Sequence, residues 1–116
     1  MKNFDGNLKY KNKEYKLVFN LNVMERIQEE YGSIDEWGRL TDGMNNGEPD
    51  AKAVIFGFTE MINEGIDIQN EDAEEKLPFL TKKQVGRMIT EIGLKESTKT
   101  LNETVINSTE STEKNA

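Results

Sequence analysis

The side chains available for chemistry in this 116-residue chain are almost all carboxylates, hydroxyls and amines, because the sequence contains no cysteine and no histidine. Without cysteine, a disulfide framework and a thiolate metal site are excluded. Without histidine, the chain lacks the usual general base at neutral pH, the commonest zinc ligand and the usual partner of a serine nucleophile. The remaining candidates become reactive only in a special environment.

One segment has the outline of a calcium-binding loop. Asp42, Asn46 and Gly47 fall at suitable positions. However, Met44 occupies the third ligand position, and Ala53 stands where the bidentate glutamate is required. The spacing therefore argues against a calcium site.

Most of the other acidic residues are expected to be solvated. The run from Asp67 to Glu75 matches no ligand spacing and indicates an exposed linker. Glu60 and Glu64 fall beside the apolar stripe of a predicted helix, where solvation would make them poor general acids. We therefore predict that the chain is not an enzyme, with no catalytic residues, no metal and no cofactor.

The elements that position these side chains begin with a β-hairpin. Tyr15, Leu17 and Phe19 repeat at period two, after a polar segment at 11–14, which predicts strands at roughly 7–11 and 14–19. A lone hairpin is marginally stable, so one face must pack on helices. The phase predicts that Tyr15, Leu17 and Phe19 point inward and that Lys16 points outward.

Four helices are expected after the hairpin, because apolar residues recur at helical spacing beside capping residues. Trp37 is expected to anchor the core. The helix from Asp50 to about Glu64 is the most hydrophobic and should form the centre of the core. A loop is expected at 41–49 and a helical turn within 70–76.

The boundaries of the four helices are predicted from capping residues. The predicted starts are Asn20 or Asn22, Ser33 with Glu36, Asp50, and Thr81 with Gln84, and the predicted stops are Gly32, Gly65 and Gly93.

From Lys95 onward the sequence is rich in Ser, Thr, Asn, Glu and Lys, and its few apolar residues would bury little area. We therefore predict an α+β fold with one domain over 1–94 and a disordered tail over 95–116. Leu101, Val105 and Ile106 leave an alternative open, since they could form a helical turn on a partner.

The charge is uneven along the chain. The formal net charge is -7, but residues 1–19 carry five Lys against Asp5 and Glu14. Residues 20–94 carry seven Lys or Arg against sixteen Asp or Glu. An acidic surface argues against nucleic-acid binding, and no apolar run reaches the length of about 18 residues that suits a membrane span. The absence of a hydrophobic signal region at the start indicates a cytoplasmic protein.

Three blocks of sequence resemble the tail assembly chaperones of long-tailed, siphovirus-type phages and prophages of Gram-positive bacteria. Together they span most of residues 8–94. The blocks are Tyr15–Ile27 with Glu30–Ser33, Ala53–Phe58 with Asn63–Gly65, and Leu80–Gly86 continuing to Ile92–Gly93.

The resemblance implies partners and a cellular role. Such chaperones bind the tape-measure protein, keep its hydrophobic helical segments soluble and help to recruit tail-tube protein around it. Many self-associate, many are also made in a longer frameshifted form, and they leave before the virion matures. A tail assembly chaperone of the bacterial host cytoplasm, binding neither nucleic acid nor membrane, is the function we expect.

A holder of amphipathic helices needs adaptable apolar side chains, and methionine suits that role. Met24, Met61 and Met88 lie on or beside three predicted helix stripes, and Phe56 lies off the central stripe. These four are the predicted protein-binding residues. The alternative is that the methionines fill the core.

A rival function follows from the charge. An acidic phage-encoded inhibitor could imitate nucleic acid and bind a host DNA-binding protein. Such mimicry would need carboxylates spaced along one face, whereas here Arg39, Lys82, Lys83 and Arg87 interrupt them. That interruption favours the chaperone.

Overall fold

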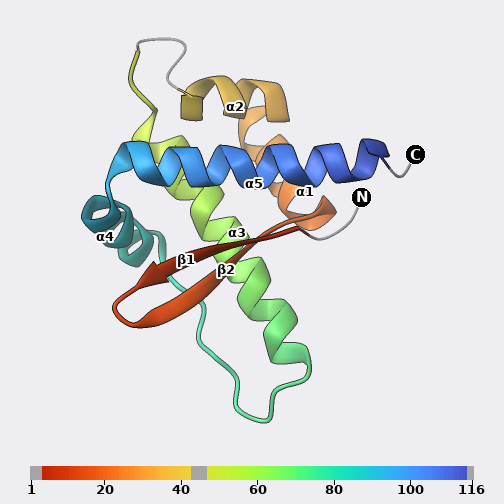
Figure 1. The fold of residues 1–116 in the computed structure, drawn as a ribbon, viewed down its shortest axis with the longest axis vertical. Coiled ribbons are helices and arrows are strands. Elements are labelled where there is room, and N and C mark those ends of the chain that lie inside the picture. The colour runs from red at the N-terminus through yellow and green to blue at the C-terminus, as the bar shows by residue number, and fades with distance from the viewer. Residues whose placement is uncertain (1–3, 43–46, 115–116) are drawn as a thin grey trace.

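A computed structural model describes residues 4–42 and 47–114, with side chains over 7–42 and 47–108. A two-stranded hairpin comes first, and five helices follow in the described part of the chain (Figure 1). This confirms the predicted α+β class. The elements are β1 Phe4–Tyr10, β2 Lys13–Phe19, α1 Leu21–Tyr31, α2 Ile34–Asp42, α3 Ala51–Glu71, α4 Lys82–Ile92 and α5 Leu94–Lys114. The predicted loop tip at 43–46 lies outside the described residues.

The hairpin is antiparallel, with Leu8 opposite Tyr15. Lys11 and Asn12 form its turn with φ of 50° and 64°, the left-handed pair that a two-residue type I′ turn needs to follow the strand twist. Leu17 and Phe19 are buried and Lys16 is exposed, as predicted. Tyr15 and Lys16 lie near the turn. Val18, on the opposite face of β2 from Leu17 and Phe19, is buried as well, so both faces of β2 are covered at the end far from the turn.

Helix α3 is the centre of the core, and β2 packs along it. Phe58, Met61 and Ile62 are fully buried. The predicted stop at Gly65 is wrong, because α3 continues to Glu71. Gly65 serves a different purpose: a Cβ at this position would lie 2.8 Å from the carbonyl oxygen of Lys16, so glycine permits the close approach of β2.

Trp37 anchors the other end of α3, as expected. Its side chain is buried, and its indole N–H donates to the carbonyl oxygen of Ala53 at 3.0 Å. A Cβ at Gly57 would lie only 2.4 Å from Trp37 Cζ2, so the ring packs directly on the α3 backbone. The bond satisfies the indole nitrogen inside an apolar site.

The predicted helix starts are confirmed. Asn20 caps α1 by accepting from Val23 N–H at 3.2 Å, and Asp50 caps α3 by accepting from Ala53 N–H at 2.9 Å. Thr81 and Gln84 form the complete capping box of α4. Because each signal lies within one turn of the chain, local chemistry is enough to fix these boundaries.

The C-terminal segment differs from the expectation of a disordered tail and of a domain that ends at residue 94. Helix α5 spans Leu94–Lys114 and packs on both strands, on α2, α3 and α4. Leu101 is fully buried within the single core cluster, and Val105 packs against that cluster. The few apolar residues of this segment therefore suffice because the rest of the domain offers them a surface, which composition alone does not reveal.

Candidate functional site

The four predicted protein-binding residues do not form an exposed surface. Met61 and Met88 are buried in the core cluster, and Met24 is half-buried against it. Phe56 is only 6% exposed. The alternative of core packing therefore describes the methionines, and Met24, Phe56, Met61 and Met88 do not offer the exposed apolar side chains that the predicted binding role needs.

Phe56 is buried because neighbouring elements cover the face of α3 that faces away from the main stripe. Its ring meets Tyr31 edge to face, with centroids 5.5 Å apart and planes at 77°. The ammonium nitrogen of Lys82 lies 5.3 Å from the Phe56 ring centroid, within cation–π range. Helix α3 is thus hydrophobic on most sides because it lies at the centre of the bundle.

A different surface lies between α1 and α3. It is a shallow groove of about 400 Å³, which we call the α1–α3 groove. One stripe of α3 forms its floor, and the other lining residues come from α1 and from Phe79 after α3. The lining residues are Asn22, Val23, Glu25, Arg26, Glu60, Asn63, Glu64, Asp67 and Phe79.

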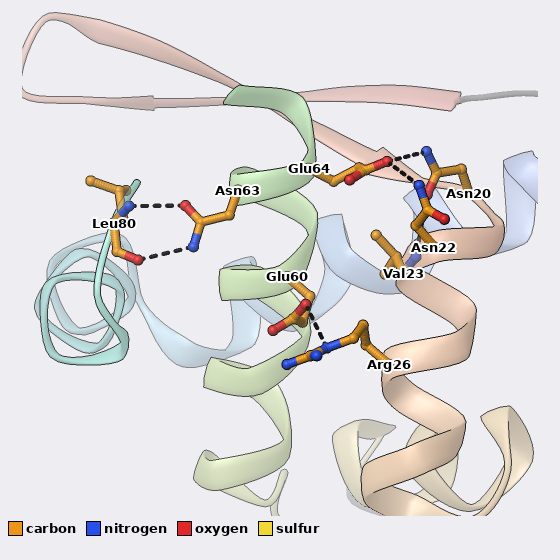
Figure 2. Close-up of polar contacts among 8 residues, drawn as sticks. All are labelled: Asn20, Asn22, Val23, Arg26, Glu60, Asn63, Glu64 and Leu80. Atoms are coloured by element: carbon orange, nitrogen blue, oxygen red, sulfur yellow. Dashed lines mark hydrogen bonds and ion pairs between the residues drawn. The ribbon is translucent and has the colours of Figure 1, made fainter. Parts of the chain in front are cut away.

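Polar bonds across the groove hold α1 against α3 (Figure 2). Glu64 Oε2 accepts from the side-chain amides of Asn20 at 2.7 Å and Asn22 at 3.1 Å. Arg26 Nε lies 3.5 Å from Glu60 Oε1. Asn20 uses both ends of its carboxamide, because its oxygen caps α1 while its nitrogen reaches Glu64. These bonds fix the spacing of the two helices.

The groove is acidic. Its lining contains four carboxylates, from Glu25, Glu60, Glu64 and Asp67, against the single guanidinium of Arg26. Glu64 is bonded by neutral amides, so its charge is not cancelled there. The groove therefore offers a negative surface to a cationic ligand.

The segment 72–81, which we call the strap, reaches the groove through Phe79. Asn63 holds it by a two-point clasp, accepting from Leu80 N–H and donating to Leu80 C=O, both at 2.9 Å (Figure 2). Asn70 repeats the clasp two turns later on Leu77, at 2.9 Å and 3.0 Å. Because a side-chain amide reproduces the pairing of a peptide group, the strap lies along α3 without forming a strand.

The clasps leave two large apolar side chains in solvent. Phe79 is 55% exposed at the edge of the groove, and Leu77 is 46% exposed further along the strap. An aromatic ring beside carboxylates can take the apolar face of a partner helix while the acids take its basic residues. Sequence analysis missed this surface, although Asn63 and Asn70, seven residues apart on one helix face, were a signal for it.

Among the described residues, no group of three or more carboxylates is arranged to hold a metal ion. In the same part of the chain, no helix has the length and apolarity to cross a bilayer. Comparison of the chain with protein-family models, with curated proteins and with solved structures finds no match.

Proposed function

We propose that this protein is a phage or prophage tail assembly chaperone that binds helical segments of a tape-measure protein. The sequence blocks that resemble such chaperones support the proposal, and so does the α1–α3 groove. Tail-tube protein is the second proposed partner, and self-association of the chain is part of the proposal. The proposed location is the cytoplasm of the bacterial host, with release before the virion matures.

The observation that carries the proposal is the exposed ring of Phe79 beside the acidic floor of the α1–α3 groove. The stripe from Glu60 to Asp67 is eight residues long, which corresponds to about 12 Å of helix surface. A helix of two turns in the bound tape-measure protein, which we call the client, matches that length. Its aliphatic residues would pack on Phe79, and its Lys or Arg residues would lie against Glu25 and Asp67.

The test is co-expression with the client, the tape-measure protein. If this protein is such a chaperone, we expect a long coiled-coil reading frame next to its gene to encode that client. The client should become soluble and co-elute with the full chain. Phe79→Ser should reduce the co-eluted client at least about 5-fold, because interface aromatics commonly contribute 1–2 kcal/mol or more. Leu21→Ser is the matched control, since Leu21 is 64% exposed and does not line the groove.

Two results would count against the proposal. If the client precipitates with and without the chain, this protein is not its chaperone. If Phe79→Ser and Leu21→Ser reduce co-elution equally, the α1–α3 groove is not the binding surface. Circular dichroism of both variants checks that each remains folded, as the exposure of the two side chains predicts.

The acidic inhibitor stays a second candidate because the four carboxylates of the groove gather on one surface. A nucleic-acid mimic would bind a basic partner mainly through charge, so its affinity would fall steeply as salt rises. Client binding would fall less steeply, because its apolar contact with Phe79 is not screened by salt. Titration of the captured partner at about 50 and about 500 mM salt separates the two functions, because those concentrations differ several-fold in screening length.

A further inference from the structure

The buried face of α5 is made mainly of hydroxyl side chains. Its most buried positions are Ser97, Leu101, Thr104 and Ser108, at spacings of four, three and four residues. This spacing places the four on one helix face toward the domain. Only Leu101 among them is apolar, whereas a helix docked by hydrophobic contact normally carries aliphatic residues at such positions.

The surface of the domain on which α5 lies, which we call its seat, receives no hydrogen bond from the hydroxyl groups of Thr104 and Ser97 in the described structure. Thr104 Oγ1 donates to the carbonyl oxygen of Thr100, within α5 itself, at 2.9 Å. Ser108 Oγ donates to the carbonyl oxygen of Phe19 at 3.2 Å, a long bond. Ser97 Oγ is buried and has no hydrogen-bond partner in the described structure. A buried hydroxyl without a partner opposes docking of the helix that carries it.

The segment is also a poor helix former on its own. Ten of the 21 residues in α5 are Ser, Thr or Asn, counted as three, five and two. These residues compete with helical hydrogen bonding through their side chains. An isolated helix of this composition would be largely unfolded in water, so α5 depends on its seat for its structure.

The seat, in contrast, suits an amphipathic helix well. It is formed by β1 and β2 together with α2, α3 and α4, and α5 crosses it along the width of the molecule (Figure 1). Leu101 enters the same contiguous cluster as Leu8, Phe19 and Trp37. Removal of α5 would therefore expose apolar surface of the main core.

We propose that α5 is a displaceable occupant of a helix-binding face, and that an amphipathic partner helix with aliphatic residues at i, i+4 and i+7 takes its place. Such a helix would offer apolar side chains where α5 offers Ser97 and Thr104. This goes beyond the proposed function, because the face is distinct from the α1–α3 groove. It also holds whatever protein supplies the helix.

The probe for this exchange is a fluorescein-labelled synthetic peptide of the α5 sequence, residues 94–114, carrying Ser97→Ala, Thr104→Val and Asn107→Ala. The first two changes remove hydroxyls from the buried face at nearly constant volume. The third, at an exposed position, raises helix propensity. Binding to the full chain is followed by fluorescence anisotropy, with a scrambled peptide of the same composition as reference.

Substitutions in the protein's own α5 leave the seat intact and change only how strongly α5 competes with the peptide for it. Leu101→Ala and Ser108→Ala loosen α5, so each should bind the peptide at least about 10-fold more tightly than the native chain. The peptide keeps Leu101 and Ser108, so it restores the contacts that these variants lack. Ser97→Ala tightens α5 and should weaken peptide binding several-fold. Lys99→Ala, at an exposed position, should leave it unchanged.

Equal affinity of the native chain, Leu101→Ala and Ser108→Ala for the peptide would overturn the proposal, as would binding no stronger than that of the scrambled peptide. Ser108→Ala decides the matter if Leu101→Ala fails to fold. No tape-measure protein enters this experiment, so its failure leaves the chaperone proposal standing, and loss of client co-elution leaves α5 displacement standing.

Discussion

At the scale of single residues, two glycines of α3 show where other parts of the chain come closest to the central helix. Gly57 faces the ring of Trp37, and Gly65 faces the carbonyl oxygen of Lys16. Glycine inside a helix normally costs about 1 kcal/mol relative to alanine. The fold accepts that cost at these two sites because a methyl group would push apart elements that carry buried contacts.

Gly57→Ala should therefore destabilise the protein by about 1–3 kcal/mol, because the new Cβ would lie 2.4 Å from the buried Trp37 ring. Gly38→Ala is the matched control. Gly38 is also helical, but a Cβ there meets nothing within 4 Å, so the change should stabilise the protein by about 0.5–1 kcal/mol. Urea unfolding of both variants measures the difference. Equal effects of the same sign would show that the ring and the helix are not in close contact.

Ionisation of Tyr31 should make the folded protein less stable at alkaline pH. Burial, followed by the carboxylates of Asp50 and Glu30, raises the pKa of the Tyr31 phenol above its usual value of 10.0. Below that value the phenol is neutral in the folded and unfolded states, and the stability is fully present. As the pH rises further, the unfolded chain releases this proton first, so stability falls until the folded-state pKa is passed.

Tyr31→Phe should remove that contribution to the pH dependence. The Tyr31 hydroxyl is buried without a hydrogen-bond partner in the described structure, so phenylalanine should be tolerated near neutral pH. The free energy of unfolding of the variant, relative to the native chain, should rise between about pH 8 and about pH 11. A constant difference across that range would mean that Tyr31 ionises as freely in the folded protein as in the unfolded chain.

At the scale of elements, the predictable features are those set within a few residues of sequence. The hairpin and the caps at Asn20, Asp50 and Thr81 were predictable, since each rests on local patterns. The continuation of α3 through Gly65 was not, because it depends on where β2 packs. The burial of Phe56 likewise depends on Tyr31 and Lys82, which come from other helices.

The strap is held by the two asparagine clasps, and they should differ in strength. Asn63→Ala leaves the half-buried peptide groups of Leu80 without partners, so it should destabilise the protein by about 1–3 kcal/mol. Asn70→Ala removes the same pair of bonds at an exposed site, where water replaces them, and should cost less than about 1 kcal/mol. Chemical denaturation compares the two, and a cost for Asn70→Ala equal to that for Asn63→Ala would refute the ranking.

At the scale of the whole molecule, the domain is thin. Its extents are 45 × 38 × 23 Å, so its shortest dimension holds about two layers of helices, each about 10 Å across. In a molecule this thin, each outer element covers a large share of the core. The candidate groove and the seat of α5 could not be found from the sequence, because each is made by elements that lie far apart in the chain.

A thin domain with one weakly held outer helix should not open uniformly. The amides of α3, which surround fully buried Phe58, Met61 and Ile62, should exchange with solvent only when the whole domain unfolds. The amides of α5 between Leu101 and Ser108 should exchange through a smaller opening that releases α5 alone. Native-state hydrogen exchange should then show protection in α5 at least about 10-fold lower than in α3. Ser97→Ala should narrow the gap, because it removes a buried hydroxyl that opposes docking. Equal protection of the two helices would instead mean that α5 opens only with the whole core.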